Sequence, residues 1–181
     1  MSSKYITMIT NQIEPDLIPI AIVRFAAKNR DPEFLSALNA CKATPEDECK
    51  LQDYVDRVFD FIKTYLDKVV TWTDLGVDFT PQVAHEFLEF HKTVSDFANM
   101  VIDHCIQVLP SLVPFTSVER QSVFRALYIL ELVRLLIPFK SHDLDKVHFM
   151  FWVYFPPWEN KQVDCIFHSL CGLVEEGKFS P

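Results

Sequence analysis

The chain has 181 residues, a formal net charge of −8 and 49% hydrophobic residues, enough for one ordinary domain with a real core. Nucleic-acid binding is not expected, because neutralising phosphates takes clustered Lys and Arg, and the sequence holds no such cluster. No apolar stretch reaches the ~20 residues of a membrane span, and no signal-peptide pattern opens the chain, so we expect a cytoplasmic protein that inserts into no membrane. Three isolated glycines provide no phosphate-binding loop, and no cofactor is indicated.

Helix-start signals divide the first part of the chain. Residues 16–29 and 32–43 have the apolar spacing of short helices, and Asp31 followed by Pro32 is typical of a cap and first helical position. Thr44 with Asp47 three residues later resembles a capping box before the next helix. The sequence therefore predicts helices from its first third onward.

Two long amphipathic helices are predicted over residues 45–109. Their apolar residues recur at alternating steps of four and three, a heptad-like seam. The two seams are Leu51, Val55, Val58, Ile62, Tyr65, Val69 and Trp72, then Val83, Phe87, Phe90, Val94, Phe97, Val101, His104 and Val108. A short link joins them and Thr80–Pro81 starts the second, so we expect a long antiparallel hairpin.

A central buried helix is predicted over residues 117–137. Thr116 and Glu119 form a capping box at its start, and the helix is apolar nearly all round. Shorter helices fit residues 143–154 and 157–176. The fold class is thus all-α, a single helical-bundle domain of about six to eight helices over residues 1–181, which could be part of a longer protein.

Charged residues in the central helix are the first candidates for a site. One interpretation is an ion pair between Glu131 and Arg134 on a narrow polar edge, at the i,i+3 spacing. The alternative is an anion-binding cleft lined by Arg120, Arg125, Glu131 and Arg134. Buried charges are costly unless they are paired, so both interpretations predict partners for these side chains.

The stretch "HFMFWVYFPPWENKQVDC", residues 148–165, is unusually rich in aromatic residues. The simpler interpretation is a core corner, in which Trp152 and Trp158 are inaccessible and Pro156 and Pro157 separate two helices. The alternative is an exposed patch for a partner or an apolar ligand, with Trp158 and Glu159 beside the charged residues of the central helix.

No metal site or catalytic set is predicted from spacing. His85 and His91 are six residues apart, whereas a zincin helix needs a spacing of four. His104 continues an apolar seam and is expected to be buried. On the last helix the predicted core face is Val163, Ile166, Phe167, Leu170 and Val174, so Cys165 and His168 should face away from the core. Asp164 lies one turn before His168, but no further ligands accompany them.

Three segments carry a resemblance, "IEPDLIPIAI" near the start of the chain and two later ones with a recognisable pattern. Glu119, Arg120, Arg125, Ala126, Tyr128 and Glu131 fit an E-R-x4-R-A-x-Y-x2-E-L pattern; Phe155, Pro156, Pro157, Trp158, Glu159, Gln162, Cys165 and Ile166 fit F-P-P-W-E-x2-Q-x2-C-I. In these segments the chain resembles a family of uncharacterised helical proteins of filamentous fungi. The resemblance implies a fungal source and a helical fold, and it implies no activity and no site.

The sequence favours a non-enzymatic intracellular interaction or scaffold domain whose partner is another protein. The alternative is a small-molecule-binding protein or enzyme. Its cleft would be lined by Arg and Glu of the central helix and by the aromatic corner at 149–158. Whether the chain is an enzyme, and its oligomeric state, are open at this point.

Overall fold

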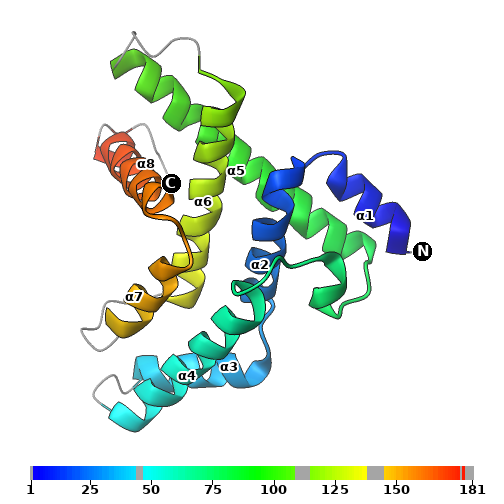
Figure 1. Cartoon of the computed structure of the whole chain (residues 1–181), viewed down its shortest axis with the longest axis vertical. Coiled ribbons are helices and arrows are strands. Elements are labelled where there is room, and N and C mark those ends of the chain that lie inside the picture. Colours follow the sequence, from blue (N-terminus) through cyan, green and yellow to red (C-terminus); the bar gives the residue numbers. More distant parts are fainter. Residues whose placement is uncertain (1, 44–46, 109–114, 138–144, 176, 178–181) are drawn as a thin grey trace. The chain divides into compact units, whose positions relative to one another are not determined.

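The computed structural model describes residues 2–43, 47–108, 115–137, 145–175 and 177 (Figure 1). Within these ranges the chain is all-α, with eight α-helices, two short 3₁₀ helices and no strand, which confirms the predicted fold class. The elements are α1 (Ser2–Thr10), η1 (Pro15–Leu17), α2 (Ile18–Lys28), α3 (Pro32–Ala43), α4 (Glu48–Tyr65), η2 (Trp72–Leu75), α5 (Pro81–Val108), α6 (Ser117–Leu136), α7 (Asp145–Val153) and α8 (Pro157–Glu175).

The helices gather into two compact units, each assembled from separate stretches of the chain. Unit 1 comprises Met1–Ala21, Val77–Leu130 and Pro157–Pro181, and unit 2 comprises Ile22–Gly76 and Glu131–Pro156. Two of the four boundaries between the units fall within helices, one in α2 and one in α6. The expectation of a single domain over residues 1–181 stays a prediction.

In unit 1, α5 is the shared support, because α1 and α8 both pack on it (Figure 1). The sequence analysis missed α1. Its segment is rich in β-branched residues and carries no cap or proline signal, and burial of Ile9 together with Ile13 just after the helix secures it. Tertiary packing has therefore overridden a weak local preference.

In unit 2, α4 lies beside α3 and also packs on α7 (Figure 1). Helices α3 and α4 contact each other through aromatic rings. The ring centroids of Phe34 and Tyr54 are 5.6 Å apart, and the rings are nearly perpendicular. The two long helices predicted within 45–109 are confirmed as α4 and α5, but they belong to different units and each packs on helices of its own unit. Heptad spacing predicts an apolar stripe and does not say which helix covers it.

The predicted helix starts are confirmed where the structure describes them. The Phe34 N–H donates to Asp31 Oδ1 at 2.8 Å, and the Val83 N–H donates to Thr80 Oγ1 at 3.3 Å. The α4 cap is corrected: Asp47 accepts from the N–H groups of Cys49 and Lys50, and Thr44 lies outside the described residues. Each cap satisfies amide groups that the helix itself leaves without partners.

The predicted seams run past the ends of the observed core stripes. Helix α4 ends at Tyr65, so Val69, predicted to continue its seam, is 80% exposed. On α5, Phe87, Val94 and Val101 are buried as predicted, but Ala84 and Ala98 are buried in place of Val83 and Phe97, and Val108 is exposed. The larger apolar residue next to each alanine led the prediction to the wrong neighbour.

Two helices carry most of the continuous burial. Every residue from Ile20 to Ala27 of α2 is buried, including Arg24, whereas the sequence predicted only a short helix over residues 16–29. The predicted central helix, α6, is buried over most positions from Val123 onward, whereas its first turn is exposed. The sequence analysis therefore identified one of the two most buried helices.

Candidate functional site

The seven candidate site residues fall into separate local arrangements. Unit 1 contains Arg120, Arg125, Trp158 and Glu159, and unit 2 contains Glu131, Arg134 and Trp152. The four charged residues of the central helix, for which an anion-binding cleft was the alternative interpretation, each take part in ion pairs or hydrogen bonds within their own unit.

The first arrangement joins α6 to α8 in unit 1. Arg125 Nε donates to Glu159 Oε1 at 2.8 Å, and the Glu159 side chain is only 7% exposed. Glu159 lies in the first turn of α8, where the helix dipole favours a negative charge. The pair joins α8 to α6 and gives the buried carboxylate an ionic partner at Oε1, whereas Oε2 is buried without a hydrogen bond.

The Arg120 side chain contacts α5, whereas Arg125 contacts α8. Its Nη2 donates to Asn99 Oδ1 of α5, and its guanidinium lies over the Phe124 ring at 5.9 Å from the centroid. Arg120 is exposed, so both contacts are at the surface. They tie the start of α6 to α5 and leave Arg120 without a role in a shared cleft.

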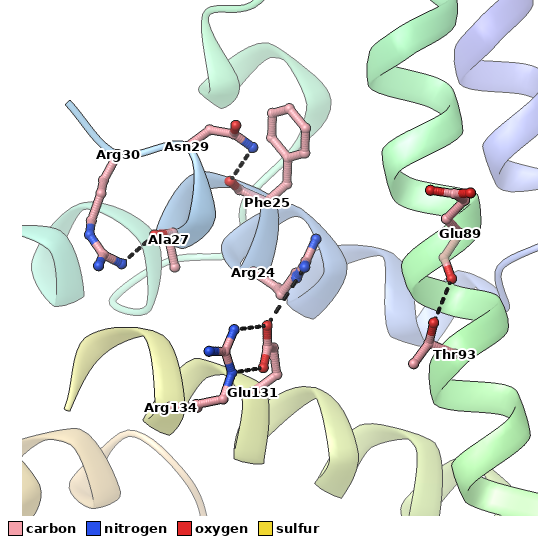
Figure 2. A network of polar contacts seen from close by, with 9 residues as sticks. All are labelled: Arg24, Phe25, Ala27, Asn29, Arg30, Glu89, Thr93, Glu131 and Arg134. Carbon is pink, nitrogen blue, oxygen red and sulfur yellow. Dashed lines mark hydrogen bonds and ion pairs between the residues drawn. The ribbon is translucent and has the colours of Figure 1, made fainter. Parts of the chain in front are cut away.

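The second arrangement centres on the Glu131 carboxylate in unit 2 (Figure 2). Arg134 binds it with two hydrogen bonds, Nε to Oε2 at 2.6 Å and Nη2 to Oε1 at 2.9 Å. The Nη2 atom of Arg24, on buried α2, lies 3.6 Å from Oε1. The predicted i,i+3 ion pair is confirmed, and the hydrogen bonds that Arg134 donates to Glu131 raise the pKa of Arg134 above its ordinary value.

Arg24 is a site residue that the sequence analysis missed. A signal was present, because Arg24 is the one charged residue in the run "IAIVRFAA". Its side chain is 8% exposed, and a guanidinium in such a setting requires a carboxylate or other acceptors. A lone charge in an apolar helix therefore predicts a buried polar network.

Arg30 and Tyr54 add two more polar groups to unit 2. Arg30 Nη1 donates to the Ala27 carbonyl at 2.7 Å (Figure 2), and its guanidinium lies 4.8 Å from the centroid of the Phe34 ring. Burial lowers the pKa of Arg30, and the positive charge of Arg134 lowers it further. The Tyr54 hydroxyl donates to the Leu136 carbonyl at 2.5 Å and holds the end of α6, and burial raises the pKa of Tyr54.

The aromatic stretch is part core and part surface. Phe151 and Phe155 are buried, with their rings 5.1 Å apart, and Trp152 packs edge-on against Phe151 while remaining partly accessible. The prediction that Trp158 is buried is wrong: it is 57% exposed, and Phe149 is 69% exposed. Glu159, rather than Trp158, occupies the buried face of the first turn of α8.

The core stripe of α8 is rotated relative to the predicted one. Val163 and Ile166 are buried as expected, but Phe167 and Val174 are more than half exposed. The buried stripe also includes Glu159 and Leu173. Glu159 lies on the buried face of α8 although it is polar. A prediction from residue type alone placed Phe167 on that face instead.

An apolar groove lies between α6 and α8 within unit 1. It has a volume of about 330 Å³, and apolar side chains make up most of its lining surface. The lining residues are Phe115, Val118, Glu119, Ser122 and Val123 on one side and Lys161, Gln162, Cys165 and Ile166 on the other. Val118 is 69% exposed at its edge, and the Cys165 thiol is free and exposed.

Trp158 belongs to the same face of α8 as this groove. It precedes Gln162 by four residues and Cys165 by seven, spacings that place side chains on one stripe of a helix. Val118, Trp158 and the groove together form an apolar feature that unit 1 presents to solvent, and we call them the α6–α8 surface.

His91 is a second residue that the sequence analysis did not single out as a site. Its Nδ1 is 3.3 Å from the buried Tyr128 hydroxyl, and its Nε2 is 3.8 Å from Glu14 Oε2. Its ring stacks with the Tyr128 ring and lies 5.7 Å from the Phe124 ring. Burial lowers the pKa of His91, an effect that Glu14 partly opposes.

Of the two other histidines whose burial was predicted, His168 takes the expected surface position and His104 does not take the expected core position. His168 is exposed and its Nδ1 is 3.3 Å from Asp164 Oδ1, as the spacing predicted. His104 is only partly buried, beside a hollow lined by Met100, Asp103 and Leu173, so the prediction of a core histidine is wrong. Among the described residues, no three His, Cys, Asp or Glu side chains are arranged to hold a metal ion.

Comparison with known proteins adds no relative. No family model, curated protein or solved structure matches the chain. In the described ranges, no helix combines the length and hydropathy that crossing a membrane requires. The candidate site therefore has to be judged from its own geometry, and the α6–α8 surface is the feature that the internal packing leaves unexplained.

Proposed function

We propose that the chain is a non-enzymatic protein-interaction or scaffold domain in the cytoplasm, and that it binds a protein partner through the α6–α8 surface. The observation that carries this proposal is the apolar groove between Val118 and Cys165, with an exposed valine at its edge and an exposed tryptophan on the same helical stripe. Exposed apolar patches with polar rims are typical of protein-binding sites.

The composition of the surface supports a protein partner over a small polar ligand. Trp158 offers a large rigid anchor, and tryptophan is enriched among the residues that dominate binding energy at interfaces. The exposed residues Glu119 and Lys161 also line the groove, and their charges can orient a partner that binds the apolar surface. Most of the lining surface of the groove is apolar, which favours a protein partner over a small polar substrate.

The alternative function, a small-molecule binder or enzyme, has less support. Its charged residues are engaged in internal contacts: Arg125 binds Glu159, Arg134 binds Glu131, and Arg120 binds Asn99. An anion-binding arginine has to present its fork to the ligand. The resemblance to a fungal family likewise stays a proposal about origin and adds nothing on activity.

Affinity capture from the native cells with a matched pair of variants tests the proposal. Val118→Arg places a charge at the edge of the groove, and Val174→Arg places one at a similarly exposed position of α8 outside the groove. We expect Val118→Arg to lose the proteins captured by the wild-type chain and Val174→Arg to retain them. Equal capture by both variants would contradict a role for the α6–α8 surface.

A further inference from the structure

We propose that the partner seated on the α6–α8 surface is a second copy of this chain, related by a two-fold axis. The inference rests on the proposed function, because it names the occupant of the same surface. In a two-fold interface the same patch is used by both copies, so the patch has to be complementary to itself.

The charges at the groove meet this requirement. Glu119 comes from α6 on one wall and Lys161 from α8 on the other, and both are exposed. A two-fold axis that brings Glu119 of one copy against Lys161 of the other creates the reciprocal pair at the same time. A partner with a uniformly charged face would satisfy one wall and oppose the other.

Glu119 is held ready for such a contact. Its Oε2 accepts hydrogen bonds from the Thr116 N–H and hydroxyl, both at 2.7 Å, in the capping box of α6. These bonds fix the side chain and lower the pKa of Glu119, so the carboxylate is charged at neutral pH. Its other oxygen, Oε1, is available to a lysine from a second copy.

The apolar part of the surface is also complementary to itself. Val118 and Trp158 project from it, and the groove of about 330 Å³ recedes beside them. A second copy turned by half a revolution presents its own projections and its own groove. Burying both tryptophans would place at the centre of the interface a residue type that often dominates binding energy.

Charge reversal on each wall gives a decisive experiment. Glu119→Lys leaves lysines on both walls, and Lys161→Glu leaves carboxylates on both, so each variant should repel its own copies. Mixing the two variants restores both reciprocal pairs in the heterodimer. We expect each variant alone to dimerise at least about tenfold more weakly than the wild type, and the equimolar mixture to recover most of that loss.

Sedimentation velocity measures the dissociation constants, and native mass spectrometry identifies the heterodimer by mass. Ser122→Lys is the substitute for Glu119→Lys if the loss of the capping box lowers the melting temperature, because it charges the same wall and keeps the cap. A wild-type chain that is monomeric at about 100 µM would overturn the proposal, as would dimers that are insensitive to all the variants.

The outcomes also separate this inference from the proposed function. If the wild-type chain is monomeric while Val118→Arg still loses captured proteins, the second-copy inference is wrong and the interaction surface stands. If neither charge reversal nor Val118→Arg changes any association, both proposals are wrong.

Discussion

Arg125 and Glu159 form the contact that joins α6 to α8: Arg125 Nε lies 2.8 Å from Glu159 Oε1, and the carboxylate is almost fully buried. The arginine keeps about a third of its side chain exposed, so the two partners face different environments. The wall of the α6–α8 surface depends on this contact, because Gln162 and Ser122 line the groove one turn away on either helix.

The two ends of that contact should respond differently to mutation. Arg125→Leu leaves a buried carboxylate without its ionic partner and should lower the free energy of unfolding by about 2–3 kcal/mol. Glu159→Gln keeps an amide oxygen that can accept from Arg125, and it should cost less. Urea denaturation of both variants makes the comparison. A larger loss for Glu159→Gln than for Arg125→Leu would contradict this account.

Glu131 should matter more than its exposed partner. Glu131→Leu removes the carboxylate that faces buried Arg24, so we expect a loss of about 2–4 kcal/mol in the free energy of unfolding. Arg134→Leu breaks two hydrogen bonds from a side chain that is 68% exposed, and it should cost less than about 1 kcal/mol. Chemical denaturation under the same conditions compares the two, and equal losses would argue against a buried role for Arg24.

The aromatic stretch allows a clear comparison of core with surface. Phe151→Ala removes a fully buried ring and should cost roughly 3–5 kcal/mol. Trp158→Ala removes a side chain that is 57% exposed, so stability should change by less than about 1 kcal/mol. Melting temperatures measure both losses. Acrylamide should quench part of the tryptophan fluorescence of the wild-type chain, and this quenchable part should be absent from Trp158→Ala. A strongly destabilised Trp158→Ala variant would contradict the exposed position of Trp158.

His91 should make stability depend on pH. Burial holds its pKa below the ordinary value of 6.5, so the unfolded chain binds a proton at this residue more readily than the folded chain does. The stabilising contribution is complete above that value, and it is lost as pH falls from there through the lowered pKa of the folded chain.

His91→Gln removes this titration and keeps an amide that can reach the Tyr128 hydroxyl. Between about pH 7 and pH 5 the free energy of unfolding should therefore fall less steeply for His91→Gln than for the wild type. Denaturation at a series of pH values measures the slope. An identical slope in the two proteins would mean that the titration of His91 is not linked to folding.

The sequence predicted most helices because their signals are local. Asp31, Thr80 and the Thr116–Glu119 box each mark a helix start by a contact within four residues, and the structure contains each one. Helix α1 has no such local signal in the sequence. Its packing on α5 stabilises it instead. The partners of α4 and α5 were equally hidden, because an apolar stripe does not specify what covers it.

Single local contacts of the candidate site could be predicted from the sequence, but the arrangement of the whole site could not. The i,i+3 pair of Glu131 and Arg134 follows from helix geometry, whereas Arg24 and Glu159 reach their partners from distant parts of the sequence. Trp158 was assigned to the core because aromatic residues usually lie there, but Glu159 holds the buried position next to it. The groove arises from the packing of two helices, and no spacing rule describes it.

The central claim is that the α6–α8 surface is where partners bind, and site-specific photo-crosslinking tests it most directly. A photoreactive residue at Ser122, which lines the groove, should yield a covalent product with the partner. The same residue at Lys92, an exposed position on α5 outside the groove, should yield none. A product from Lys92 but not from Ser122 would contradict the claim.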